Sequence, residues 1–328
     1  MSDSRVGARV AAVQSATRRF DALAWALPAL LVAVTVAGGV TTDGFSSAAN
    51  FEAILRNASI VGIVAVGMSL VTVSGNLISL AAQPSAMLPA VLVAALLSRG
   101  ESMALTLAVV LAMVLVVGLI QGYVIGLGLN AIVASLAFGT VIVGAVALFS
   151  GDNSGAFTFA PRGLRHVAGD LLGAPVVVIV FILVTVGTTV FVRHSVIGRH
   201  IILSGANPAA AIVSGVSIRK STLWAFVGLG ITAAIAGVIV ASTVGQATTV
   251  MLPSLMIDVV TAVLIGGISI QGGVGSPMNA ALGAVFISLL NNLFALHNVS
   301  DGYHQMFEGG LLLVAILVVH FASQRRGK

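Results

Sequence analysis

The stretch between Arg56 and Arg99 constrains the fold of this chain more than any other feature, because residues 57–98 contain no Asp, Glu, Lys or Arg. An α-helix rises about 1.5 Å per residue and a bilayer core is about 30 Å thick, so this stretch can cross a membrane twice. The whole chain carries 8% charged residues, against about 25% in soluble domains. We therefore predict an integral membrane protein, and exclude both a soluble globule and a disordered chain.

The same criterion predicts an all-α polytopic protein with about ten transmembrane helices in a single domain over residues 1–328. The polar and helix-breaking residues from Ser74-Gly75-Asn76 to Gln83-Pro84 predict the turn between the two crossings within 57–98. The other eight spans are predicted near 23–40, 103–123, 131–149, 174–192, 222–244, 253–270, 277–296 and 307–321.

The basic residues predict the orientation of the chain. They concentrate at three places: Arg5, Arg9, Arg18 and Arg19; Arg193, Arg199, Arg219 and Lys220; and Arg325, Arg326 and Lys328. The positive-inside rule places all three groups in the cytoplasm. An even number of spans, six and then four, separates them, so the spans and the charges agree. We expect a cytoplasmic tail over 1–22, a cytoplasmic loop over 193–221, an external loop over 150–173 and both termini inside.

Several chemistries are excluded by what the sequence lacks. There is no cysteine, which excludes disulfides and thiolate metal sites, and no two histidines stand four apart as a helical metal pair would. No phosphate-binding loop with its lysine occurs, even in the glycine-rich run 266–273, so no ATP site is expected. The basic residues are scattered among apolar runs, which indicates no nucleic-acid partner. We predict no cofactor, no metal and no enzymatic activity.

Energy coupling is expected to come from outside the chain. A proton- or sodium-coupled carrier would place several ionisable residues within its spans near the middle of the bilayer, whereas the candidate here, Asp258, lies near the outer end of the eighth span. Asp258 either lines a pathway or hydrogen-bonds a neighbouring helix. The same two interpretations apply to Asn291 and Asn292, for which bonding between helices is favoured.

Other residues indicate how the helices pack and where they end. Gly118, Gly122 and Gly126 stand four apart, so they share one face of a helix and allow a neighbour to approach closely. The large polar aromatic residues lie at or near predicted span ends, as membrane-interface anchors do: Trp25, Tyr123, Trp224 and Tyr303.

The loop 193–221 predicts a short helix on the cytoplasmic face. Asn207 can cap a helix that begins with Pro208, three alanines propagate it, and Ser214-Gly215 ends it. Such a helix is either a rigid knob that another protein pushes or a simple interfacial connector.

The chain resembles the membrane permeases of bacterial ABC importers, in the ribose-type branch that takes up simple sugars. The matching residues in the loop are Gly198, Arg199, Gly205, Asn207, Ala210, Ala211, Ser214, Gly215 and Val216. Further matches are Asp258, Ile265-Gly266-Gly267-Ile268-Ser269, Gly272-Gly273-Val274-Gly275-Ser276, Asn291-Asn292-Leu293 and Gly309-Gly310-Leu311. The resemblance covers nearly the whole chain, and its most specific part is the loop with the Gly-Gly-x-Ser segment.

The resemblance implies a multi-pass subunit of the bacterial inner membrane that forms the translocation pathway by alternating access. It also implies two permease copies, or this chain with a paralogue, two separate ATPase subunits and a periplasmic or extracellular solute-binding protein. The residues expected to couple to the ATPase are Gly198, Arg199, Gly205, Asn207, Pro208, Ala210, Ala211, Ser214 and Gly215. The charged loop 150–173 either docks the binding protein or is a plain connector.

The chain departs from the family pattern at three positions. The segment Gly75-Asn76-Leu77-Ile78-Ser79-Leu80 lacks the acid of the family's Gly-Gly-Ile-Asp-Leu-Ser. Met256 replaces a glutamate, and Ala209 replaces an acid in the short helix. The candidate pathway residues are Asn76, Ser79, Asp258, Ser269, Asn291 and Asn292. The alternatives to a permease subunit are a self-contained secondary transporter or channel and a non-transporting assembly partner.

Overall fold

The structure is a computed structural model that describes residues 27–149, 157–158, 169–171, 173–248 and 251–324. The predicted tail 1–22 and Trp25 lie outside the described residues. So does most of the predicted external loop, including Asp152, Arg162 and Arg165. The single-domain organisation and the cytoplasmic and external assignments stay predictions.

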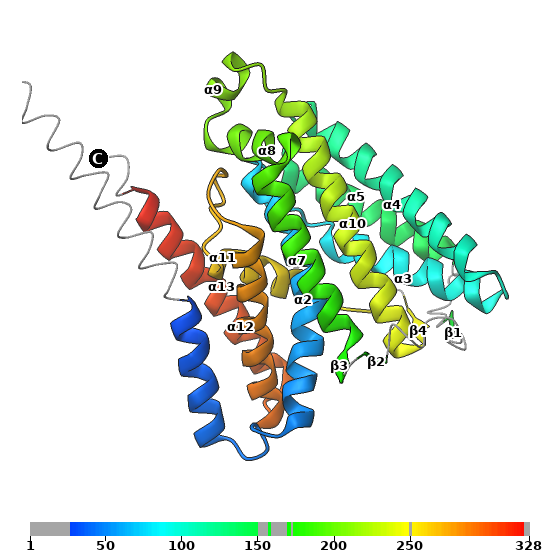
Figure 1. Ribbon diagram of the computed structural model, residues 1–328, viewed down its shortest axis with the longest axis vertical. Coiled ribbons are helices and arrows are strands. Elements are labelled where there is room, and N and C mark those ends of the chain that lie inside the picture. The colour runs from blue at the N-terminus through cyan, green and yellow to red at the C-terminus, as the bar shows by residue number, and fades with distance from the viewer. Residues whose placement is uncertain (1–26, 150–156, 159–168, 172, 249–250, 325–328) are drawn as a thin grey trace, which may run out of the picture.

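The fold is a bundle of apolar helices around α2 (Figure 1). Helix α2, Ala48–Val73, is the most deeply buried of the long apolar helices and packs against α7, α10, α11 and α12. Glycines allow this burial: a Cβ at Gly62 would overlap the ring of Phe181, and one at Gly67 would overlap Thr232. Because only a hydrogen occupies these positions, neighbouring helices approach the α2 backbone closely.

The remaining helices follow the order of the predicted spans. Their bounds are Leu27–Thr41, α3 Ala82–Ser98, α4 Met103–Gly126, α5 Ala131–Phe149, α7 Val176–His194, α8 Val196–Ala206, α9 Pro208–Val213, α10 Ile218–Val244, α11 Leu255–Ile265, α12 Pro277–Leu296 and α13 Asp301–Gln324. In Figure 1, α8 and α9 lie at one end of the bundle, and the turn between Leu27–Thr41 and α2 lies at the other.

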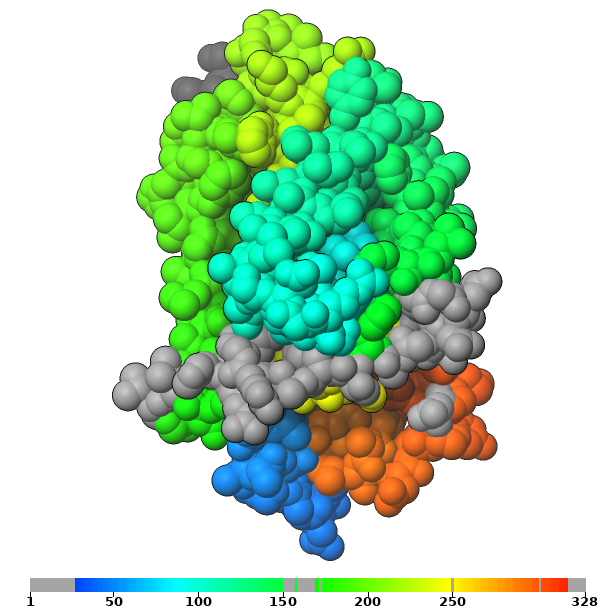
Figure 2. All heavy atoms as spheres, turned by 90° about the vertical axis from the view of Figure 1, so that its right-hand side faces the viewer, coloured from blue at the N-terminus to red at the C-terminus, as the bar shows by residue number. Residues whose placement is uncertain are grey.

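Six helices of the described part are long and apolar enough to cross a membrane: α2, α4, α5, α7, α10 and α12. Two of them, α4 and α5, lie side by side on one face of the molecule (Figure 2). Most of their apolar side chains are exposed, including Leu111, Val133, Val141 and Leu148. Exposing so large an apolar surface to water is unfavourable, so this face is suited to contact with lipid. The polytopic all-α prediction is thus confirmed, whereas ten crossings stay a prediction.

The predicted span 253–270 is too long. Helix α11 covers 11 residues, or about 16 Å, roughly half of a bilayer core. It ends because Gly267 adopts a φ of +75°, and the amides of Gly267 and Ile268 turn back to the carbonyls of Leu264 and Val263 at 2.9 and 3.2 Å. This left-handed end is one that glycine favours. The loop Gly266–Ser276 follows in place of the predicted last turns.

Two other boundaries differ from the prediction. Helix α3 begins at Ala82, so Pro84 stands within its first turn and the break between α2 and α3 covers only residues 74–81. Proline is tolerated there because the first amides of a helix have no helical partner. The residues before Asn207, expected to be loop, form α8, which Ser195 caps by accepting a hydrogen bond from the Gly198 amide at 2.8 Å.

The predicted packing face of Gly118, Gly122 and Gly126 is confirmed. All three face α10, where a Cβ at Gly122 would lie 2.7 Å from the Leu223 Cα and one at Gly118 would lie 3.1 Å from the Val227 Cα. The partners on α10 are also four residues apart, so two helix backbones meet along a ladder of small contacts.

Two short sheets complete the described structure. Strand β1, Phe157–Thr158, pairs antiparallel with β4, Gln246–Ala247, and β2, Asp170–Leu171, pairs with β3, Ala174–Pro175. Arg56 of α2 contacts the second sheet through an ion pair with Asp170 at 3.0 Å, and also pairs with Glu52 at 2.7 Å. These contacts tie the predicted external loop to the start of the central helix.

Candidate functional site

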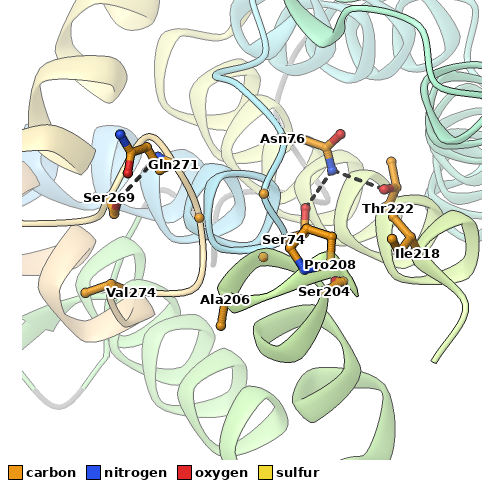
Figure 3. A pocket seen from close by; sticks show the side chains of 13 residues that line it. Ser74, Asn76, Ser204, Ala206, Pro208, Ile218, Thr222, Ser269, Gln271 and Val274 are labelled. Atoms are coloured by element: carbon orange, nitrogen blue, oxygen red, sulfur yellow. Dashed lines mark hydrogen bonds between the residues drawn. The ribbon is translucent and has the colours of Figure 1, made fainter. Parts of the chain in front are cut away.

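A polar pocket of about 480 Å³ opens where α2, α8, α10 and the loop Gly266–Ser276 meet, beside the start of α9 (Figure 3). Its lining contains hydroxyls, amides and glycine backbone but no charged side chain. The lining residues are Ser74, Gly75, Asn76, Ser204, Gly205, Ala206, Pro208, Ile218, Thr222, Ser269, Gln271, Gly272 and Val274.

Asn76 joins two walls of this pocket. Its Nδ2 donates to the Ser74 Oγ at 2.8 Å and to the Thr222 Oγ1 at 3.1 Å (Figure 3). Ser74 ends α2 and Thr222 lies in the second turn of α10, so one amide bridges two helices. An amide both donates and accepts, and it remains neutral. Asn76 therefore supplies polarity to the pocket without a charge.

The opposite wall is formed by the loop after α11. The Ser269 amide donates to the carbonyl of Val274 at 3.0 Å, and the Ser269 Oγ accepts from the Gln271 amide at 3.2 Å (Figure 3). The loop is thus held by its own backbone and by one hydroxyl. It presents the Gln271 side chain and the Ser269 hydroxyl beside the pocket.

The predicted short helix is present as α9. Asn207 has an extended backbone, and its Oδ1 accepts from the Ala210 amide at 3.0 Å. Pro208 occupies the first helical position, and Gly215 with a φ of +77° follows the end. This is the capping that the sequence predicted.

Helix α9 protrudes from one end of the bundle (Figure 1). Within it only Ala211 is buried, and Val213 is 89% exposed. Among the other residues expected to couple to an ATPase, Arg199 is exposed, while Gly198 and Gly205 are buried at helix contacts. The exposed residues of α9 form a small, largely apolar, uncharged knob that another protein can contact.

The predicted pathway residues fall into separate places. Asn76 and Ser269 line the pocket beside α9. Ser79 is fully buried nearby, where its amide approaches the Met68 sulfur at 3.4 Å and its Oγ lies 3.4 Å from the Gln121 Nε2. Asp258, Asn291 and Asn292 lie in other contacts, so the structure does not bring the six candidates into one site.

Asp258 belongs to a polar cluster between α11, α12 and α13. Its Oδ1 accepts from the Asn291 Nδ2 at 3.0 Å, and the Asn291 Oδ1 lies 3.0 Å from the His304 Nε2. His304 also pairs with Glu308 at 3.4 Å. Asp258 is 3% and Glu308 4% exposed. The expected hydrogen bond to a neighbouring helix is therefore present at Asp258 and Asn291.

Asn292 pairs instead with Asn50 of α2. The two side-chain amides donate to each other at 2.7 and 3.0 Å. This agrees with the favoured interpretation of the asparagines as bonds between helices.

Sequence reasoning missed several polar residues of these sites. Thr222 and Gln271 in the pocket carried no signal, because single neutral residues near span ends are common. His304 and Glu308 stand four apart at the start of α13, a spacing that places them on one face, and this could have indicated their pairing. Within the described residues no group of His, Asp or Glu is arranged to hold a metal ion.

Residues 50–316 match the family described as the branched-chain amino acid transport system / permease component. The chain belongs to this permease family. The matched segment contains the pocket, α9 and the polar cluster, so the candidate sites all lie in the shared part of the chain.

The relatives of this permease include sugar importers. It is 29% identical over 306 residues to the ribose import permease protein RbsC of Haemophilus influenzae, which covers 91% of this chain and 93% of that protein. It is 30% identical over 281 residues to RbsC of Bacillus subtilis, covering 85% of this chain and 87% of that protein. The probable ABC transporter permease YphD of Escherichia coli is 30% identical over 290 residues, covering 88% and 87%.

These relatives confirm the resemblance to ribose-type ABC permeases. The chain matches no solved structure at a significant level. Its homologues are transport permeases rather than enzymes.

Proposed function

We propose that this permease forms the translocation pathway of an ATP-binding-cassette importer for a small uncharged solute rich in hydroxyl groups, such as a monosaccharide. It would act as a pair with a second copy or a paralogue in a bacterial inner membrane. We place both termini and α9 in the cytoplasm and assign ten crossings to the chain. The pathway would alternate between outward- and inward-facing states.

The observation that carries the coupling role is the exposed, capped helix α9. Its residues form a rigid knob at the end of the bundle where the basic loop 193–221 lies, and the positive-inside rule favours the cytoplasm for that loop. A knob on the cytoplasmic face is suited to a groove on an ATPase. Since the sequence has no phosphate-binding loop, we assign ATP hydrolysis to separate subunits and capture of the solute to a separate external binding protein.

The lining of the pocket supports a neutral solute. Every polar side chain in it is a hydroxyl or an amide, groups that bond to sugar hydroxyls as donors or acceptors. An amino acid carries two charges at neutral pH, and burying them would require charged partners. The uncharged lining therefore favours a sugar, as in the names of the ribose import permeases, over an amino acid, as in the description of the family.

Replacing residues 207–215 with a Gly/Ser segment of equal length tests the coupling role. Solute uptake by the assembled transporter should be lost, and the ATPase should no longer co-purify, while membrane insertion stays normal. A matched control replaces Leu127–Leu129, in the exposed turn between α4 and α5, and should leave uptake intact. Unchanged uptake after the α9 replacement would contradict the proposal.

The alternative function is a self-contained ion-coupled carrier. The observation in its favour is the polar cluster between α11, α12 and α13. Asp258, His304 and Glu308 are titratable groups in contact between helices, the kind of group that ion-coupled carriers use. The purified permease reconstituted alone should move no solute under a proton or sodium gradient. Gradient-driven uptake by the permease alone would support the carrier instead.

A further inference from the structure

Three backbone segments from distant parts of the chain meet beside α9. They are Val73–Gly75 at the end of α2, Gly205–Ala206 at the end of α8, and Gly272–Gly273 in the loop between α11 and α12, and we call them the glycine junction. The Gly273 amide donates to the Val73 carbonyl at 2.9 Å. Ser74, Gly75, Gly205, Ala206 and Gly272 of these segments line the pocket in Figure 3.

The glycine junction leaves no room for a side chain at Gly205 or Gly272. A Cβ at Gly205 would overlap the Val73 carbonyl oxygen and lie 2.7 Å from the Gly273 nitrogen and 2.8 Å from the Gly75 nitrogen. A Cβ at Gly272 would lie 2.5 Å from the Gly75 Cα. Backbone atoms cannot rotate aside as a side chain can, so the three segments fit together only with glycine at these positions.

The junction is connected to α9 without a flexible linker. Asn207 follows Ala206 directly; its amide donates back to the Leu203 carbonyl of α8 at 3.1 Å, and its side chain caps α9. Asn207 is thus bonded to both helices. Asn207 therefore links α9 to Gly205, which contacts the end of α2 and the middle of the α11–α12 loop.

The glycine junction connects α9 to α2 and, through the loop between α11 and α12, to α12, two helices at the centre of the bundle. Helix α2 packs against α7, α10, α11 and α12, and the loop Gly266–Ser276 leads directly into α12. A push on α9 thus has a backbone route to the centre of the bundle. Close-packed elements move as rigid bodies rather than deforming continuously.

We propose that the glycine junction moves as one rigid piece during transport and transmits the displacement of α9 to α2 and α12, with Gly205 and Gly272 as positioning residues. The inference rests on the proposed function of α9 as the element that an ATPase displaces. It adds the contact through which that displacement reaches the membrane helices.

The first experiment uses the assembled transporter with Gly205→Ala or Gly272→Ala in the permease. Insertion, ATPase co-purification and the KM for uptake should be unchanged, whereas the maximal uptake rate should fall roughly tenfold because the segments no longer fit together. The matched controls are Gly144→Ala and Gly187→Ala, at helical glycines with open space around them, and both should keep the normal rate. A normal rate with Gly205→Ala, or equal losses in the controls, would overturn the proposal.

A second experiment separates transmission from folding. The chain has no cysteine, so Ala206→Cys and Val274→Cys introduce the only two thiols, one on each side of the junction. Short bifunctional thiol reagents of a given length should bridge them to the same extent with and without ATP, because the distance across a rigid piece does not change during transport. A bridging length that changes when ATP is added, or failure of every reagent length to bridge the pair, would overturn the proposal.

The α9 replacement distinguishes the two levels of inference. If that replacement abolishes uptake while the junction variants do not, α9 couples to the ATPase by another route and only the junction proposal fails. If the replacement leaves uptake intact, the coupling role of α9 itself fails.

Discussion

Asn50 and Asn292 hydrogen-bond each other through both side-chain amides, at 2.7 and 3.0 Å, and so join α2 to α12. Asn50 also donates to the carbonyl of the fully buried Phe45. The pair therefore connects the central helix both to α12 and to the turn that precedes α2. In a setting with little water, two neutral amides can satisfy each other without introducing a charge.

Replacing Asn292 with leucine should lower the stability of the protein in detergent by about 0.5–2 kcal/mol, because the Asn50 amide loses its partner. Thermal unfolding checks this. The double variant Asn50→Leu with Asn292→Leu should cost less than the sum of the single variants, since neither partner is then left unpaired. Asn57→Ala, at an exposed position of α2, is the control and should change the melting temperature little. Additive losses would mean that the pair is not coupled.

The contact between α4 and α10 gives a second stability prediction. Gly122→Ala should destabilise the protein by about 1–3 kcal/mol, because the new Cβ would press on the backbone of α10, 2.7 Å from the Leu223 Cα. Gly144→Ala on α5, where nothing lies within 4 Å, should be neutral or slightly stabilising. Melting temperatures of the two variants make the comparison, and equal changes would contradict the role assigned to Gly122.

The sequence predicted the parts of this fold that depend on apolar length, spacing and capping. Gly118, Gly122 and Gly126 indicated a packing face because helical spacing alone determines which residues share a face. Asn207-Pro208 indicated α9 because capping depends on neighbouring residues. Both predictions are local, and both are confirmed.

The features that the sequence did not predict depend on contacts between distant segments. Helix α11 is short because Gly267 adopts a positive φ, and in an apolar run a glycine is equally compatible with a continued helix. Residues 196–206 were predicted as loop because their helix depends on packing against α7, where a Cβ at Gly198 would lie 2.5 Å from the Val192 Cα. The approach of Asn76 to Thr222, 146 residues apart, likewise has no local signal.

Asp258 supports a prediction that separates charge from hydrogen bonding. Asp258→Asn should keep nearly normal stability, because the amide oxygen can still accept from the Asn291 Nδ2. Asp258→Leu should cost about 1–3 kcal/mol, because it leaves the Asn291 amide without its acceptor. Thermal unfolding of the two variants, compared with Asn291→Leu and the double leucine variant, measures the coupling. Equal destabilisation by asparagine and leucine would show that the charge, rather than the hydrogen bond, stabilises the cluster.

The cap of α9 supports a prediction about assembly. Asn207→Ala removes the side chain that accepts from the Ala210 amide at 3.0 Å, and loss of such a cap costs about 0.5–2 kcal/mol. Helix α9 has six residues and buries only Ala211, so packing cannot compensate, and we expect weaker co-purification of the ATPase and slower uptake. Asn207→Ser restores a capping oxygen and should restore both. Ser217→Ala removes the corresponding cap of α10, but the extensive packing of that helix should preserve assembly. If the alanine and serine variants at 207 behaved alike, the order of the first turn of α9 would not matter for coupling.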